Sequence, residues 1–240
     1  MFCRDIDTLF VHIPKTGGNF IERNLDALRL SNDRLTTVGH QDGIHRFGVV
    51  GQFTREKHDS FLVQAKRARA AGRWDFDALS VYRDPVDRMI SLYLSPHRFW
   101  SVRHAVKVRK RVARLMRLDG KKLDTNQAFK FKPPKAFNLP EFSELLINAP
   151  SATDLLVDEN GLLPRRLALI DFKDLTLGLK EFLFQHGVTK SLPFLEPINQ
   201  SAGADLGVKM RSDKNVRDLV MKSHHAVDLQ LTDYVSLPTA

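Results

Sequence analysis

At 240 residues, with 42% hydrophobic and 27% charged residues, the chain has the length and composition of one globular domain with a substantial core, and no apolar run is long enough to span a membrane. Its single cysteine, Cys3, excludes an intrachain disulfide and a cysteine-based zinc site, and the charged residues from Arg4 to Asp7 interrupt any signal peptide, so we expect a cytoplasmic protein. The net charge of +9 is carried by residues 98–135, which contain 13 Lys and Arg residues against two acidic ones and thereby favour a polyanionic partner.

The first predicted unit is a strand, a glycine turn and a helix. The apolar run 9–13 is typical of a buried strand, and apolar spacing predicts a helix over 20–30. Glycines between them let the backbone approach an anion, the free amides at the helix start point toward it, and Lys15 adds a full positive charge. The expected phosphate cradle comprises Lys15, Thr16, Gly17, Gly18 and Asn19. The alternative is a strand-to-helix turn with an incidental lysine.

The order of residues in this turn disfavours an ATPase or kinase loop. A Walker A loop carries its lysine after the last glycine, and a Ser or Thr that binds magnesium follows the lysine. Here Lys15 precedes Gly17 and Gly18, and no Gly-Lys-Ser or Gly-Lys-Thr sequence occurs in the turn. A cradle of this order binds phosphate groups without the magnesium ligand of a Walker A loop.

A polar loop, a basic helix and a second strand are predicted next. Residues 33–51 are loop-like and contain His40 within a polar group. Residues 61–71 are rich in Ala, Lys and Arg, which indicates a basic surface helix. Residues 76–82 read as a strand, in which 79–82 is the part that we expect to be buried.

The second motif follows this strand. Asp84 is a good N-cap and Pro85 suits the first position of the helix that follows. Arg83 therefore lies at the carboxyl end of a parallel strand, where ligands of open α/β sheets bind, and its planar fork suits a phosphate. Ser91, eight residues after Arg83, lies two helical turns into that helix and shares a face with its start. An Arg83 paired with a nearby carboxylate and a packing serine would explain the same residues equally well.

The rest of the chain adds one more strand and several helices. A very basic helix is predicted over 101–118 and an irregular region over 119–140. The remaining elements are a helix over 142–148, a strand over 167–172, a helix over 174–186, a loop over 192–205 and a helix over 213–234. Because strands alternate with helices, we expect an α/β fold with a parallel sheet.

Together the two motifs resemble the sulfotransferase family that uses 3′-phosphoadenosine 5′-phosphosulfate (PAPS), in its carbohydrate-acting, heparan-sulfate-type branch. That branch carries Pro-Lys-Thr-Gly-Gly in the first turn and Arg-(Asn/Asp)-Pro in the second, with a serine eight residues after the arginine. The resemblance implies a single domain over 1–240 with a P-loop-like three-layer fold, a central parallel sheet flanked by helices. Residues 97–160 would form a basic helical or irregular insertion on the acceptor side. Asn19 departs from the pattern because the family usually has threonine there.

The resemblance also implies roles for the motif residues. The turn of Lys15 would hold the 5′-phosphosulfate of PAPS, and Arg83 and Ser91 would hold its 3′-phosphate. The spent donor would be adenosine 3′,5′-bisphosphate (PAP). The acceptor would be a hydroxylated and anionic glycan or glycolipid, attracted by residues 98–135, which could also hold the protein at a membrane surface. An alternative for those basic residues is a solvated helix face whose Lys and Arg side chains lie over apolar packing.

Sulfuryl transfer to a hydroxyl needs in-line positioning, charge stabilisation and a base. Lys15 would neutralise the charge that develops on the bridging oxygen. We expect His40 to be the base, because it lies between the two motifs and resembles a Gly-His position of uronyl-type sulfotransferases, and His45 is the second choice. His12 is expected to be a packed strand histidine. No metal is expected.

Three other functions remain open at this point. A basic nucleic-acid-binding module could use the helix over 101–118 with Phe129, Phe131 and Lys132, although no nucleic-acid motif is present and we expect no such partner. A nucleotide-dependent kinase is disfavoured by the lysine–glycine order. A non-catalytic relative would keep both motifs and lack the base.

Overall fold

The computed structural model describes residues 2–3, 6–32, 59–95, 134–188 and 204–235. Several predictions of the sequence fall outside these ranges: the polar loop over 33–51 with His40 and His45, the basic helix over 101–118, the aromatic residues Phe129 and Phe131 with Lys132, and most of the loop over 192–205. They stay predictions.

The core of the molecule is a four-stranded, mostly parallel sheet. Its strands are β1 (Phe2–Cys3), β2 (Thr8–Phe10), β3 (Asp77–Tyr82) and β4 (Leu167–Asp171), in the order β1-β2-β3-β4. β1 pairs antiparallel with β2, and the other two pairs are parallel. The predicted α/β class and its three strands are therefore confirmed, while the short antiparallel edge strand β1 was not expected. β2 is shorter than predicted, although Val11 N still donates to Leu79 O at 2.8 Å beyond its end.

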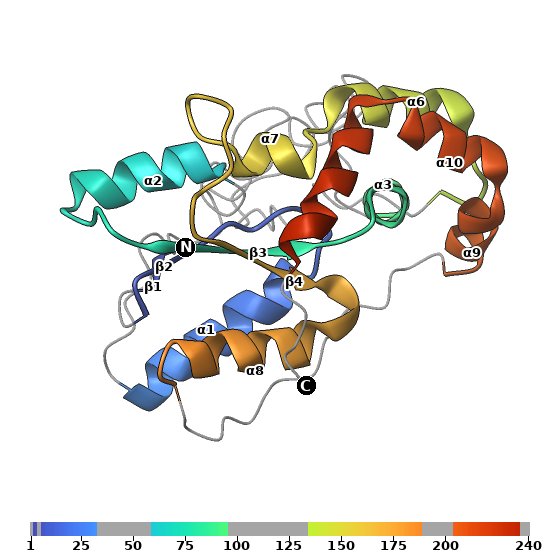
Figure 1. Cartoon of the computed structure of the whole chain (residues 1–240). Coiled ribbons are helices and arrows are strands. Elements are labelled where there is room, and N and C mark those ends of the chain that lie inside the picture. Colours follow the sequence, from blue (N-terminus) through green and yellow to red (C-terminus); the bar gives the residue numbers. More distant parts are fainter. Residues whose placement is uncertain (1, 4–5, 33–58, 96–133, 189–203, 236–240) are drawn as a thin grey trace, which may run out of the picture.

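Alternate residues of each strand point to opposite faces of the sheet, and helices cover both faces. Phe10, Leu79 and Ile170 pack against α1 (Gly18–Asn32) and α8 (Leu175–Gln185). Their neighbours Leu9 and Ala78 face the other way, toward α2 (Phe61–Ala70), α7 (Ala152–Leu156) and the 3-10 helix η4 (His224–Tyr234). In Figure 1, α1 and α8 lie side by side below the sheet and α2 and α7 lie above it.

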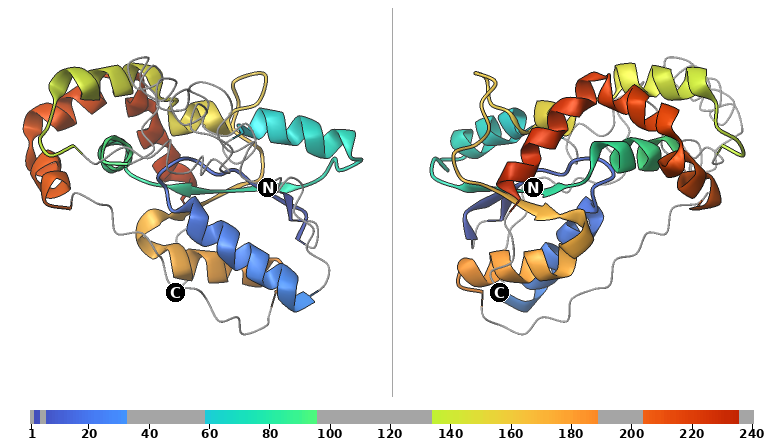
Figure 2. Two further views of the ribbon diagram at one scale, coloured as in Figure 1. Left: turned by 180° about the vertical axis from the view of Figure 1, so that it is seen from behind. Right: turned by 45° about the vertical axis from the view of Figure 1, so that its right-hand side comes forward.

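A third apolar cluster lies beyond the carboxyl end of β3. It is built from α3 (Pro85–Tyr93), α6 (Leu139–Asn148), α9 (Ala204–Ser212) and α10 (Lys214–Met221), which Figure 2 shows grouped together. The Phe142 ring is fully buried and meets the Tyr93 ring edge to face, with centroids 5.5 Å apart. Tyr93 also accepts a hydrogen bond from Asn138 N at 3.0 Å, just before α6 begins. α6 and α7, which lie within the range 97–160, therefore pack into the core.

Local signals set several helix ends as expected. Asp84 caps α3, because its Oδ1 accepts from Val86 N at 2.9 Å and from Asp87 N at 3.1 Å, and Pro85 occupies the first turn. Gly187 follows α8 with φ of 76°, a left-handed conformation that glycine adopts without strain. A short 3-10 turn, η3 (Phe172–Asp174), precedes α8.

The prediction of one long helix over 213–234 is wrong. The chain forms α10, breaks at Ser223 and continues as η4. The Ser223 hydroxyl donates to Val220 O at 2.6 Å and accepts from His225 N at 3.3 Å, so it ends one helix and starts the next. Because η4 has the tighter 3-10 winding, Val227 of the predicted inner face is 37% exposed, whereas Val216 and Leu231 are buried. In the described ranges no helix is long and apolar enough to cross a membrane.

Candidate functional site

The two motifs meet at one edge of the sheet. β2 and β3 are parallel neighbours, so the turn after β2, which carries Lys15, and the turn after β3, which carries Arg83, leave the sheet at the same edge. A hydrogen bond joins them, because Arg83 Nη1 donates to Lys15 O at 2.9 Å. Two segments that are 68 positions apart in the chain thus form a single site.

The backbone of the first turn leaves its amides open to a ligand. Lys15 and Gly17 have positive φ values of 70° and 88°, and Phe20 N donates to Gly17 O at 2.8 Å to begin α1. Thr16 is buried, and its hydroxyl donates to Ile13 O at 2.9 Å, so this side chain shapes the turn. The hydrogen bonds of the described residues engage none of the backbone amides from Lys15 to Gly18. These amides stand at the positive end of a 15-residue helix, which favours an anion.

The two glycines of the turn are also required by close packing. A Cβ on Gly17 would lie 2.8 Å from Leu175 Cδ1. A Cβ on Gly18 would lie 2.2 Å from Cδ2 of the His12 ring. His12 is buried as predicted, although it lies two residues beyond the end of β2, and its Nδ1 lies 2.7 Å from Glu22 Oε1 on α1. Close approach of α1 to α8 and to His12 therefore explains this glycine pair without reference to a ligand.

Arg83 has no carboxylate partner within the described ranges. Its guanidinium lies over the Phe172 ring at 4.1 Å from the centroid, and its Nε is buried without a hydrogen-bond partner among the described residues. The two nearest acids are used elsewhere, since Asp84 caps α3 and Asp87 pairs with Arg211 at 2.7 Å. In the described residues, Arg83 therefore does not form the ion pair that was the alternative to a phosphate contact.

The surroundings of Lys15 and Arg83 disfavour the charged form of both side chains. Burial, with a smaller contribution from the charge of Arg83, lowers the pKa of Lys15 from 10.5 to about 8. Burial also lowers the pKa of Arg83 to about 10; the charge of Arg211 lowers it further, and the nearby carboxylates of Asp87 and Asp84 oppose these effects. Neither cation forms an ion pair with a carboxylate of the described residues. An anion between them would relieve both penalties.

The other predicted site residues are placed differently. Asn19 is exposed on the first turn of α1, beside the open amides. Ser91 is only 5% exposed within α3, and no described hydrogen bond joins it to Arg83 or to the turn of Lys15. His40 and His45 lie outside the described residues. In the described part of the chain, no group of three His, Cys, Asp or Glu side chains could hold a metal ion.

Two neighbours of the site, Phe172 and Arg88, were not identified from the sequence. Phe172 follows β4, and nothing in its local pattern indicates that a cation lies over its ring. Arg88 is fully buried in α3, where almost every side chain is buried. A charged residue among Val86, Met89 and Ile90 is the one signal that could have identified it, because a buried charge requires partners.

No protein-family model, curated protein or solved structure matches the chain. The chemistry of the site therefore rests on its own residues.

We predict that Gly17→Ala destabilises the protein more than Gly187→Ala. Both glycines have positive φ, so alanine at either position costs about 1–2 kcal/mol in backbone strain. Gly17 is also crowded by Leu175 whereas Gly187 has nothing within 4 Å, so we expect a further loss of about 1–3 kcal/mol at Gly17. Urea unfolding of the two variants measures the difference, and equal losses would mean that the turn does not pack against α8 as described.

Proposed function

We propose that this protein is a sulfotransferase that takes a sulfuryl group from PAPS. The observation that carries the proposal is the pair Lys15 and Arg83: two half-buried cations, joined through the Lys15 carbonyl and without a carboxylate counterion in the described structure. A site that holds two positive charges and open amides at a helix start suits a ligand with more than one phosphate group. The buried and unpartnered Nε of Arg83 is a donor that a phosphate oxygen would satisfy.

The proposed division of labour follows the two motifs. Lys15 and the open amides up to Gly18 would hold the 5′-phosphosulfate, with Asn19 at the rim, and Arg83 would hold the 3′-phosphate. Phe172 keeps the guanidinium in place from its other face. We assign Ser91 a weaker part in this contact, because its side chain is nearly inaccessible. A P-loop-like arrangement of the sheet and its first turn is part of the same proposal.

In the proposed reaction, the acceptor hydroxyl oxygen forms a new bond to sulfur as the bond from sulfur to the bridging oxygen breaks. The hydroxyl proton passes to a base, which we propose to be His40, and PAP leaves. Lys15 stabilises the negative charge that develops on the departing phosphate. The burial of Lys15 and Arg83 strengthens such stabilisation, because a charge is screened less away from water. The basic residues 98–135 would attract an anionic glycan or glycolipid acceptor.

The proposal is tested by calorimetric titration with PAP, with ATP and magnesium as the comparison. We expect PAP to bind and ATP to bind more weakly. Lys15→Ala and Arg83→Ala should each weaken PAP binding about 10- to 100-fold, the equivalent of about 1.5–3 kcal/mol for a charge-assisted contact. Lys66→Ala removes an exposed lysine on α2 and is the matched control, which should bind as the wild type does. Preferential binding of ATP would favour a kinase instead.

PAP affinity should depend on pH through Lys15. The lysine binds phosphate as the ammonium ion, and its pKa in the free protein is about 8. Affinity should therefore be highest near pH 7 and fall as the pH rises through about 8, toward the 10- to 100-fold loss expected of Lys15→Ala, while the phosphates stay ionised throughout. Lys15→Arg keeps its charge over this range, so its affinity should not fall near pH 8. An identical fall in both proteins would assign the titration to another group.

Transfer of labelled sulfate to a panel of sulfated and unsulfated glycans tests the catalytic part of the proposal. We expect turnover with the wild type, and a loss of about 100-fold or more in His40→Ala with PAP affinity nearly unchanged, because a general base contributes to the chemical step. His45→Ala is the comparison. Full turnover in the His40 variant would place the base elsewhere, and PAP binding without any transfer would indicate a non-catalytic nucleotide-binding protein.

A further inference from the structure

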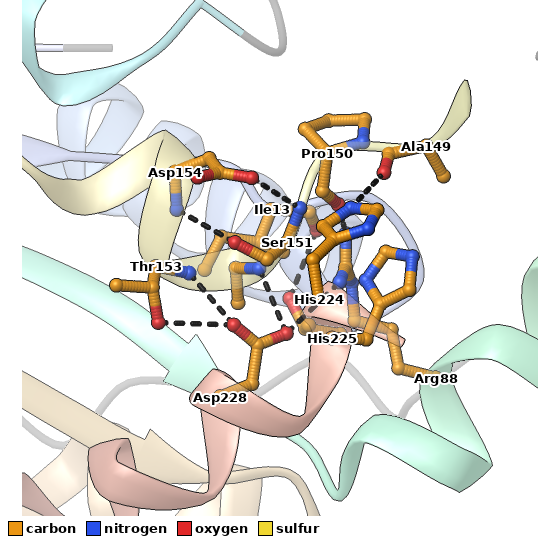
Figure 3. Close-up of polar contacts among 12 residues, drawn as sticks. Ile13, Arg88, Ala149, Pro150, Ser151, Thr153, Asp154, His224, His225 and Asp228 are labelled. Atoms are coloured by element: carbon orange, nitrogen blue, oxygen red, sulfur yellow. Dashed lines mark hydrogen bonds and ion pairs between the residues drawn. The ribbon is translucent and has the colours of Figure 1, made fainter. Parts of the chain in front are cut away.

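A buried ion pair lies directly behind the turn of Lys15. Arg88 of α3 is 0% exposed and Asp228 of η4 is 1% exposed, and Arg88 Nη1 lies 3.2 Å from Asp228 Oδ2. In Figure 3, Asp228 projects from its helix, with Thr153 on one side and Arg88 on the other. The two residues are 140 positions apart in the chain.

Arg88 contacts three separate segments of backbone or side chain. Besides Asp228, its Nη2 donates to Pro150 O at 2.7 Å and its Nε donates to Pro14 O at 3.4 Å. Pro14 is the residue immediately before Lys15. A single planar guanidinium therefore links α3 to the turn after β2, to the segment before α7 and to η4.

The carboxylate of Asp228 is fully engaged as well. Its Oδ2 accepts from Ala152 N at 2.8 Å, and its Oδ1 accepts from Thr153 N at 2.8 Å and from Thr153 Oγ1 at 3.0 Å. These are the first residues of α7, so the carboxylate also satisfies free amides at a helix start. With Arg88 it forms a network in which both charges are matched (Figure 3). The adjacent His225 adds no third charge, because burial and the charge of Arg88 lower its pKa to about 3.

The pair has a geometric consequence for Lys15. The conformation of a residue is fixed by the orientation of the peptide groups on either side of its Cα. The carbonyl of the preceding peptide, Pro14 O, accepts from Arg88, and the carbonyl of the following peptide, Lys15 O, accepts from Arg83. Two arginines thus hold the two peptide groups that set the backbone conformation of Lys15. Its φ of 70° is unusual for a residue other than glycine. A strained residue of this kind persists only where its surroundings impose it.

We infer that Arg88 and Asp228 are positioning residues that keep Lys15 in its left-handed conformation and so aim its amine at the ligand. Asp228 holds the Arg88 guanidinium, Arg88 holds Pro14 O, and η4 thereby acts on the turn of Lys15 through Arg88. A buried ion pair adds little to stability compared with apolar residues of similar size, which is consistent with a positioning role. The nature of the ligand rests on the proposed function, whereas the conformation of Lys15 does not.

The double variant Arg88→Met with Asp228→Asn tests this inference. No buried charge remains unpaired, and the Asn side-chain oxygen can still accept from the start of α7, so we expect the variant to fold. Leu231→Ala is the control, because Leu231 is buried on the same helix η4 and takes no part in the hydrogen bonds to Pro14 O and Lys15 O. Arg88→Lys is a second variant, which keeps the charge and loses the fork that reaches three acceptors.

Two readouts are needed, and each decides a different question. NMR carbon shifts of Lys15, which report backbone conformation, should lose their left-handed signature in the double variant and in Arg88→Lys and keep it in Leu231→Ala. PAP affinity should fall about tenfold or more in the same two variants, because the amine is no longer pre-positioned. Unchanged Lys15 shifts in both variants would overturn the inference. Shifts that change as expected in a protein whose wild type does not bind PAP would retain the positioning pair and reject the proposed function.

Discussion

The peptide groups on either side of Lys15 are each held by an arginine, one within α3 and one just before it. The rest of the site depends on this constraint. Arg83 binds the Lys15 carbonyl and Arg88 binds the Pro14 carbonyl. The turn is therefore not a flexible glycine loop but a fixed conformation, with a positive φ at a lysine and with amides from Lys15 to Gly18 that no hydrogen bond of the described residues engages. The parallel pairing of β2 with β3 brings the two segments to one edge of the sheet.

The distribution of charge around this edge explains why it suits an anion. Arg83 lies close enough to Lys15 to disfavour its charge, and both side chains are partly removed from water. The nearby acids compensate only in part: Asp87 and Asp84 raise the pKa of Arg83, but Asp84 caps α3, Asp87 pairs with Arg211 and Asp228 pairs with Arg88. Two cations without an ion-pair partner among the described residues cost stability in the absence of a ligand, and they favour binding of a phosphorylated one. This balance supports a site for a multiply phosphorylated ligand over a purely structural turn.

Local rules predicted the parts of this structure that depend on neighbouring residues. The strands around Leu9, Leu79 and Leu169, the cap at Asp84 and the helix stop at Gly187 could all be read from composition and spacing. The position of Arg83 at a strand end followed from the same rules. The split of the last helix at Ser223 did not, because the competing hydrogen bonds of a serine side chain leave the apolar spacing unchanged.

The interactions that fix the site were beyond such rules because their partners are remote in sequence. Asp228 is 140 positions from Arg88, and Phe172 follows β4 whereas Arg83 follows β3, so neither contact can be recognised from neighbouring residues in the sequence. The glycine pair was assigned to the ligand from sequence, whereas its closest neighbours are Leu175 and the His12 ring.

A crystal structure with PAP would test the central claim most directly. The account predicts one phosphate against the Lys15 amine and the amides up to Gly18, and the other within hydrogen-bond distance of Arg83 Nε, with Lys15 φ still positive. A nucleotide bound elsewhere on the protein, or a Lys15 side chain that points away from bound phosphate, would contradict it.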